Sequence, residues 1–408
     1  MDTSRKNYDY IKHIPVNELK IGMYIEEVLD ANNILIRYEK KILSTRSEIE
    51  NLKKTRAATG KINILKSINI KSSELDPLID ITLKKTNKRE SEYYREIKKA
   101  KDIHHEGVIR ASEVLKAVRK GHSFSLKIVK NVAEDIVESI LRNSDALLSL
   151  SQLKGYDDYT YVHSVNVAIL ITAFYNSVGY NIDKLVEAGM GGILHDIGKM
   201  RIPENILNKP GKLTDSEFSI IKRHPEYGIN AIINKRGISD ITKKVILQHH
   251  ERYNGRGYPF GIKGERINEV GLISAVADVY DALTSDRVYK AAWTPHKAIA
   301  CIFREKGSSY SSHIVDMFTK LIGVYPIGSF VRLVSGEMGF VVKIENGRLL
   351  APSILVLFKQ DGVRVKEPFI IDLWKMQDRE NGKNFKIDIA LNPKSFNVNV
   401  DEYIQTKK

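Results

Sequence analysis

Two aspartates stand inside strongly apolar stretches, and they limit what this chain can fold into more than any other feature. Asp196 lies within residues 191–199, and Asp278 lies within residues 273–283. Burying an unpaired carboxylate is costly, so each side chain needs a cation or strong hydrogen-bond donors beside it. Because His195 directly precedes Asp196, a metal ion is the simplest partner for the pair.

Histidines gather in the same part of the chain. Five of the 11 histidines are His163, His195, His224, His249 and His250. A lone histidine is more often an ordinary core or surface residue than a ligand, but the neighbouring aspartates change these odds. Imidazole and carboxylate together suit first-row divalent metals better than calcium or magnesium alone. Five histidines and two aspartates exceed the needs of one tetrahedral ion, so the set predicts at least two metals.

The candidate ligands are widely dispersed in the sequence, from His163 to Asp278. They can meet only if several helices bring them together. This spacing argues against a structural site of the zinc-finger type and favours a site in the core of a helical bundle.

Three regions of the chain differ in their residue patterns. Residues 1–95 combine short apolar pieces with a polar stretch at 44–55, which predicts a small α/β module followed by a linker or exposed helix. Residues 96–322 carry apolar side chains at helical spacing and predict a helical domain. Residues 323–408 predict β structure, because apolar runs at 330–334 and 340–344 flank a turn that contains glycine. The predicted fold is therefore mainly α, with a small module at each end.

The net charge of +14 raises nucleic acid, a membrane surface or an anionic small molecule as partners. The excess is spread along the chain, with +7 in residues 1–150, +4 in 151–320 and +3 in 321–408. Neither a zinc-finger spacing nor an aromatic-basic RNA-binding signature is present. We therefore do not expect a nucleic acid polymer as the partner.

Cysteine content and hydropathy indicate the compartment. The single cysteine, Cys301, cannot form an intrachain disulfide, which fits a reducing environment. The densest apolar run, residues 167–175, is far shorter than the ~20 residues of a membrane span. We expect a cytoplasmic protein without a membrane span.

Several motifs in residues 157–303 resemble one enzyme family. His163, the pair His195-Asp196 and Asp278 are similar to the H…HD…D signature of the HD phosphohydrolase superfamily. Residues 202–214, which lead to His224 and its following Pro-Glu-Tyr-Gly, and residues 249–259 narrow the resemblance to the HD-GYP subfamily. The flanking regions look like the small modules often found before and after HD-GYP domains.

This resemblance implies an HD-type helical bundle and an enzyme of bacterial signalling. The implied reaction is hydrolysis of cyclic di-GMP to pGpG, and further to GMP, by a metal-bridging hydroxide. The implied cofactor is a pair of divalent metal ions, iron or manganese first, with zinc or nickel as alternatives. The implied metal ligands are His163, His195, Asp196, His224, His249, His250 and Asp278.

The resemblance also implies roles for residues around the metals. Asp196 is expected to be catalytic because the family's HD aspartate bridges the two ions. Lys199, three residues later, lies on the same helical face and can bind substrate and neutralise charge in the transition state. Arg287 and Lys290 match the family's phosphate-contacting basic pair. Tyr258, in the Gly-Tyr-Pro loop, is expected to contact the substrate or a partner.

One departure from the family pattern concerns the number of metals. Members with three metals carry a glutamate one helical turn before the first histidine, and here that position is Tyr159. A neutral phenol is a poor ligand, so we expect two metals, unless Asp157 or Asp158 reaches the site.

Three alternatives and two partners stay open at this point. The chain could act on a related cyclic dinucleotide, act on another nucleotide, or bind cyclic di-GMP as a receptor or scaffold with little turnover. The loop Gly257-Tyr258-Pro259 could dock diguanylate cyclase domains, as in the family. The apolar faces of residues 96–153 predict a homodimer.

Overall fold

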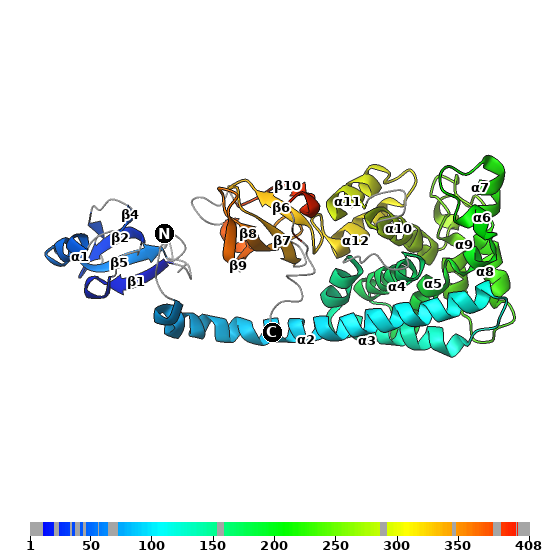
Figure 1. The fold of residues 1–408 in the computed structure, drawn as a ribbon, viewed down its shortest axis with the longest axis horizontal. Coiled ribbons are helices and arrows are strands. Elements are labelled where there is room, and N and C mark those ends of the chain that lie inside the picture. Colours follow the sequence, from blue (N-terminus) through cyan, green and yellow to red (C-terminus); the bar gives the residue numbers. More distant parts are fainter. Residues whose placement is uncertain are drawn as a thin grey trace. The chain divides into compact units, whose positions relative to one another are not determined.

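The structure, a computed structural model, describes residues 11–19, 24–32, 35–36, 41–43, 46–55, 57–63, 72–152, 159–285, 292–344, 348–377, 385–396 and 398. For residues 72–95 only the course of the backbone is described. The chain divides into two compact units, residues 1–91 and 92–408. The division into three regions at 95 and 322 stays a prediction. The fold itself is mainly helical with a small sheet towards each end, as predicted (Figure 1).

The N-terminal unit is an antiparallel sheet with one short helix. Its strands are β1 (Ile11–Pro15), β2 (Tyr24–Asp30), β3 (Leu35–Ile36), β4 (Lys41–Ile42) and β5 (Ala57–Asn63). The order is β1-β5-β2-β3, and β4 pairs with β2. The 3-10 turn η1 (Val16–Glu18) and helix α1 (Arg46–Lys53) complete the unit, and α1 confirms the short helix predicted in 44–55. Ile25, Val28 and Leu43 form its core.

Two long helices lead into the helical core. They are α2 (Ser72–Arg119) and α3 (Leu126–Gln152). The apolar positions Val114, Val118, Val132 and Ile136 are all buried in the core of the second unit. These are the faces on which the predicted homodimer rests, and the chain itself already covers them. The dimer therefore stays a prediction without support from these contacts.

The middle of the core is the pair α4 (Tyr159–Val178) and α5 (Ile182–Leu194). Residues 163–175 of α4 are all buried, as expected for a helix that is apolar on nearly all sides. Gly192 allows the two helices to approach closely, since a Cβ at this position would lie 2.4 Å from the Cα of Ala168. The side chain of Asn181 caps α5 by accepting a hydrogen bond from the backbone N–H of Lys184. The pair thus places residue 163 beside the turn that follows residue 194.

Shorter elements complete the core: η3 (Ile197–Arg201), α6 (Glu204–Leu207), α7 (Asp215–Ile221), α8 (His224–Ile232), α9 (Asp240–Gln248), η4 (Gly264–Arg266), α10 (Glu269–Thr284), α11 (Pro295–Arg304) and α12 (Ser312–Ile322). Ser239 and Asn268 cap α9 and α10, so both helices begin at defined residues. None of the helices in the described residues combines the length and the hydropathy that a membrane span requires.

The C-terminal extension is a five-stranded antiparallel sheet in the order β10-β6-β7-β8-β9. Its elements are β6 (Phe330–Leu333), β7 (Met338–Lys343), β8 (Ser353–Phe358), β9 (Arg364–Asp372), α13 (Leu373–Gln377), β10 (Ile387–Leu391) and η6 (Pro393–Phe396). The predicted hairpin is β6 and β7, paired through Phe330 and Phe340. β10 was not predicted from the sequence.

Candidate metal centre

Seven side chains from different helices, six of them buried and His250 partly exposed, meet at one point in the second unit. They come from α4, from the turn after α5, from the start of α8, from the turn after α9 and from α10. They are His163, His195, Asp196, His224, His249, His250 and Asp278. These are the seven predicted ligands. The structure brings them together, and their role as ligands stays a prediction.

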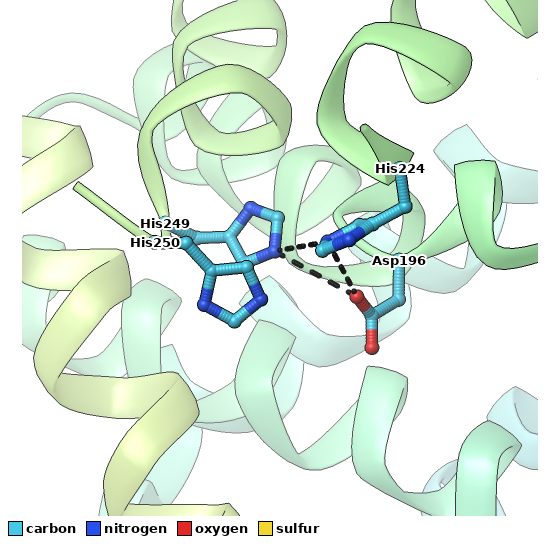
Figure 2. Close-up of side chains that lie close together, drawn as sticks. All are labelled: Asp196, His224, His249 and His250. Carbon is cyan, nitrogen blue, oxygen red and sulfur yellow. Dashed lines mark hydrogen bonds and ion pairs between the residues drawn. The ribbon is translucent and has the colours of Figure 1, made fainter. Parts of the chain in front are cut away.

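Asp196 lies at the centre of this cluster, with one carboxylate oxygen on each side. Its Oδ1 lies 3.3 Å from His224 Nε2 and 3.6 Å from His249 Nε2 (Figure 2). Its Oδ2 lies 3.4 Å from His195 Nε2 and 3.9 Å from His163 Nε2. A carboxylate placed in this way can bridge two ions, one on each side.

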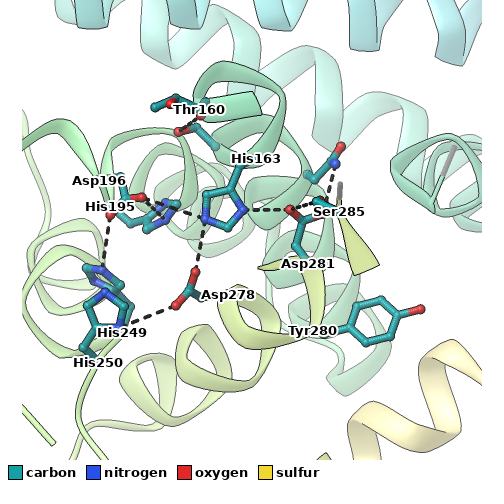
Figure 3. A network of polar contacts seen from close by, with 12 residues as sticks. Thr160, His163, His195, Asp196, His249, His250, Asp278, Tyr280, Asp281 and Ser285 are labelled. Carbon is teal, nitrogen blue, oxygen red and sulfur yellow. Dashed lines mark hydrogen bonds and ion pairs between the residues drawn. The ribbon is translucent and has the colours of Figure 1, made fainter. Parts of the chain in front are cut away.

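Asp278 also faces both sides of the cluster. Its Oδ1 lies 3.1 Å from His163 Nε2, and its Oδ2 lies 3.6 Å from His250 Nδ1 (Figure 3). Two groups of side chains result, and Asp196 belongs to both. In each group, the potential ligand atoms lie within 4.8 Å of one another. The first group is Asp196, His224, His249 and His250, and the second is His163, His195 and Asp196.

Backbone carbonyls fix the orientation of three of the imidazoles. Nδ1 of His195 lies 2.7 Å from Gly192 O, Nδ1 of His224 lies 2.9 Å from Ile221 O, and Nδ1 of His249 lies 3.0 Å from Ile246 O. A carbonyl oxygen only accepts, so Nδ1 carries the hydrogen in each ring. In the neutral form of such a ring, Nε2 presents a lone pair to the centre. This is the arrangement that metal-binding histidines adopt.

The donor set therefore fits metal ions. His224 Nε2 and His249 Nε2 lie 3.0 Å apart although neither has a hydrogen to donate in the neutral ring. Within the described part of the chain, His195 Nε2 and Asp196 Oδ1 are buried and have no hydrogen-bond partner. Converging lone pairs repel one another unless a cation lies between them. Imidazole with carboxylate is a suitable ligand set for iron, manganese, zinc or nickel.

Asp281 supports the centre from outside and was not singled out from the sequence. Its Oδ2 accepts a hydrogen bond from His163 Nδ1 at 2.7 Å, and its Oδ1 accepts one from Asn166 Nδ2 at 3.0 Å. Ser285 Oγ donates a third hydrogen bond to Oδ2 at 3.2 Å. The spacing of Asp281, three residues after Asp278 on one helical face, was the available signal.

The protonation states of the cluster suit metal binding. Burial raises the pKa of Asp196, but Lys199 and His195 outweigh it and hold the pKa well below its usual value. Burial lowers the pKa of His249 to about 4 and also lowers the pKa of His224. At neutral pH these histidines are neutral and the aspartate is ionised, which is the state that ligands require.

His163 is the exception, and this gives a testable pH dependence. Burial lowers its pKa, but hydrogen bonds with Asp278 and Asp281 outweigh burial and raise the pKa to about 9. Without metal, His163 is therefore protonated below that pH, and a metal must displace its proton. We expect the apparent affinity for Mn²⁺ on this side of the centre to rise about tenfold per pH unit between pH 6.5 and 8. Calorimetric titration in buffers of different ionisation enthalpy should show release of about one proton, and no release would contradict this assignment.

Lys199 lies beside the cluster at its solvent-accessible edge. It belongs to η3, and its Nζ lies 2.6 Å from Asp196 Oδ2. Gly198 lets η3 approach the start of α8, because a Cβ there would lie 1.8 Å from the backbone oxygen of His224. The ammonium group is thus held next to the central carboxylate, where it can face an anionic substrate.

The Gly-Tyr-Pro loop closes another side of the site. The ring of Tyr258 lies 4.6 Å from the ring of His250, centroid to centroid. Burial and Asp278 raise the pKa of Tyr258, so its phenol stays neutral. Glu251 was not singled out from the sequence, although it anchors the loop. Its two carboxylate oxygens accept hydrogen bonds from the backbone N–H groups of Phe260 at 2.8 Å and Ile262 at 3.0 Å.

Some predicted site residues lie outside the described part of the chain. Arg287, Lys290, Asp157 and Asp158 are among them. The backbone of Tyr159 begins α4, and its side chain is not described. Their predicted roles in substrate binding and metal number therefore stay predictions.

Comparison with known proteins agrees with this geometry. The family model described as HD domain matches residues 137–314. The chain is 33% identical over 372 residues to a cyclic di-GMP phosphodiesterase of Pseudomonas aeruginosa, and the match covers 89% of each protein. It is 44% identical over 128 residues to a cyclic di-GMP phosphodiesterase response regulator of Xanthomonas campestris, covering 31% of this chain and 34% of that protein. It is also 40% identical over 126 residues to a 3'3'-cGAMP-specific phosphodiesterase of Vibrio cholerae, covering 30% of this chain and 24% of that protein.

A relative of this identity that matches over nearly the whole length of both chains shows the family, and the motif with His195, Asp196 and the Gly257-Tyr258-Pro259 loop agrees with it. The chain belongs to the HD-domain family of cyclic di-GMP phosphodiesterases, the HD-GYP proteins.

Proposed function

We propose that this protein is a metal-dependent phosphodiesterase that hydrolyses cyclic di-GMP to pGpG. The observation that carries the proposal is the position of Asp196 between two groups of inward-facing imidazoles. A receptor that only binds the dinucleotide would not need six histidine and aspartate side chains gathered around the carboxylate of Asp196. The names of the relatives in Pseudomonas and Xanthomonas support the choice of substrate.

Each group of side chains would hold one divalent metal ion. His224, His249 and His250 would bind one ion, His163 and His195 the other, and Asp196 both. Asp278, which lies beside His163 and His250, would complete the ligand set. Two such ions lower the pKa of a bound water and neutralise charge on phosphodiester oxygens.

The residues of the chain orient these groups. Asp281 and the backbone carbonyls hold the imidazoles in the required tautomer. Lys199 places a positive charge beside Asp196, where it would stabilise the charge that develops on the phosphoryl oxygens. Tyr258 limits access from the side of His250, and Arg287 with Lys290 would bind the second phosphate.

The two groups predict two metal ions per chain. Protein purified with its native metals, or reconstituted with Mn²⁺ or Fe²⁺ under anaerobic conditions, should contain two ions per chain by mass spectrometric metal analysis. Three ions per chain would contradict this expectation and would indicate a ligand among residues 153–158. The identity of the native metal would come from the same analysis, with iron or manganese expected first.

The substrate is tested by incubating the metal-loaded protein separately with cyclic di-GMP and with 3'3'-cGAMP, followed by chromatography of the products. We expect linear pGpG from cyclic di-GMP, followed by GMP at a lower rate. The similarity to the Vibrio cholerae enzyme favours 3'3'-cGAMP as the second candidate substrate. Faster hydrolysis of 3'3'-cGAMP would move the proposal to that substrate. Tight binding of both dinucleotides without hydrolysis would replace it with a receptor function.

Docking of diguanylate cyclase domains to the loop Gly257-Tyr258-Pro259 also stays a proposal. Phe260, which directly follows this loop, is 58% exposed, whereas the ring of Tyr258 faces His250. A contact of the loop with another protein would therefore involve Phe260 more than Tyr258.

A further inference from the structure

A chain of hydrogen bonds leads from helix α2 to the metal centre. His104 Nε2, on α2, lies 2.8 Å from Asn166 Oδ1 on α4. Asn166 Nδ2 donates to Asp281 Oδ1 at 3.0 Å, and Asp281 Oδ2 accepts from His163 Nδ1 at 2.7 Å (Figure 3 shows the last of these contacts). None of the predicted ligands lies on α2, so this helix can affect the centre through residues other than the ligands.

The direction of each hydrogen bond follows from the chemistry of the groups. Asp281 accepts only, so the amide nitrogen of Asn166 must face it. The amide oxygen of Asn166 then faces His104, and His104 must donate from Nε2. Rotation of the amide by half a turn would break both contacts. Asp281 therefore determines which end of Asn166 faces it, and His104 stabilises this orientation by donating a hydrogen bond to the amide oxygen.

The burial of these groups makes the orientation of Asn166 important. Asn166 is fully buried and Asp281 is 1% exposed, so water does not readily replace a lost donor. Asp281 in turn fixes the hydrogen of His163 on Nδ1 and leaves Nε2 as the ligand atom. If the amide of Asn166 were reversed, Asp281 would lose a donor. The orientation of His163 would then change although no ligand had been replaced.

We propose that His104 and Asn166 are positioning residues of the metal centre, which act on His163 through the carboxylate of Asp281. The inference rests on the proposed metal centre and not on the identity of the substrate. It predicts an effect on one side of the centre only, because the imidazoles of His224 and His249 are held by backbone carbonyls instead.

α2 contacts the surroundings of the centre at a second place. Arg119, at the end of the helix, donates hydrogen bonds to the backbone oxygens of Ile202 at 2.6 Å and Lys199 at 3.3 Å. Lys199 belongs to η3, and Ile202 is the residue that directly follows η3. α2 therefore supports both His163 and the backbone that presents Lys199.

The test compares His104→Phe with two other full-length variants. Phenylalanine keeps a ring of similar size but cannot donate to Asn166. His104→Gln restores an N–H donor at the end of a flexible side chain. His105→Phe changes the neighbouring histidine, which is exposed, and is the matched control. The readout is Mn²⁺ binding measured by competition with a chelator, with the melting temperature recorded for each variant.

We expect His104→Phe to weaken one of the two Mn²⁺ binding steps about tenfold and to leave the other unchanged. His104→Gln should recover most of the loss, and His105→Phe should bind as the unmodified protein does. Unchanged binding in His104→Phe would overturn the inference. Equal weakening of both steps with a lower melting temperature would also overturn it, because it would indicate a general loss of stability. Neither result depends on hydrolysis, so a failure of the proposed function would be seen separately.

Discussion

Replacing Asp196 with asparagine is expected to abolish turnover of cyclic di-GMP and to remove at least one of the two metal ions. The carboxylate lies between His224 on one side and His195 on the other, at 3.3 and 3.4 Å. Asparagine keeps the shape but loses the negative charge and one of the two anionic oxygens, so it cannot bridge two cations. We expect kcat to fall by at least about a thousandfold, and metal content to fall to one ion per chain or fewer.

The matched control for this variant is Asp240→Asn. Asp240 is the first residue of α9, and its side chain is 91% exposed. This variant should keep two metals and full activity. That result would show that the loss of an acidic side chain is not harmful in itself. An Asp196→Asn protein with two metals and normal turnover would contradict the bridging role of Asp196.

Replacing Lys199 with methionine is expected to slow the chemical step while metal binding persists. The ammonium group lies 2.6 Å from Asp196 Oδ2, and its side chain is 26% exposed. Methionine keeps the aliphatic stem and removes the charge that would stabilise the phosphoryl oxygens. We expect kcat to fall about 100- to 1000-fold. Metal content should stay at two ions per chain, because no ligand is lost and a competing cation is removed.

Lys130→Met is a suitable comparison for the lysine variant. Lys130 lies on α3, and its side chain is 58% exposed next to Glu134. It should leave kcat, KM and metal content unchanged. If Lys199→Met instead raised KM alone and left kcat intact, Lys199 would contribute to substrate binding and not to the stabilisation of the transition state.

The architecture was predictable from the sequence where its patterns are local. Apolar spacing in residues such as Val114 and Val132 identified buried helical faces, and the apolar runs at 330–334 and 340–344 identified the hairpin of β6 and β7. β10 (Ile387–Leu391) was missed because none of its five residues is fully buried, and two of them, Asp388 and Ile389, are exposed. Its place in the sheet depends on pairing with β6, which lies more than fifty residues earlier.

In the site, the sequence predicted the side chains that belong to the family motifs and missed those that support them. Asp196 and Asp278 were singled out because an apolar setting makes a free carboxylate costly. Asp281 stands in the same apolar run, yet its hydrogen bond to His163 depends on how α4 and α10 pack. The contact of Asn166 with His104 depends on a third helix, α2. The spacing of Asp281 after Asp278 indicated a shared helical face, but the partners of Asp281 and Asn166 depend on tertiary packing, which the sequence pattern does not specify.

The most direct test of the whole account is a titration of metal-free protein with Mn²⁺, in which pGpG formation from cyclic di-GMP is followed at each metal ratio. The groups that share Asp196 predict little activity with the first equivalent of metal and a maximum rate at two equivalents per chain. Full activity with one equivalent, or without metal, would contradict a binuclear centre. Binding of cyclic di-GMP at two equivalents with no pGpG formed would contradict the proposed hydrolysis itself.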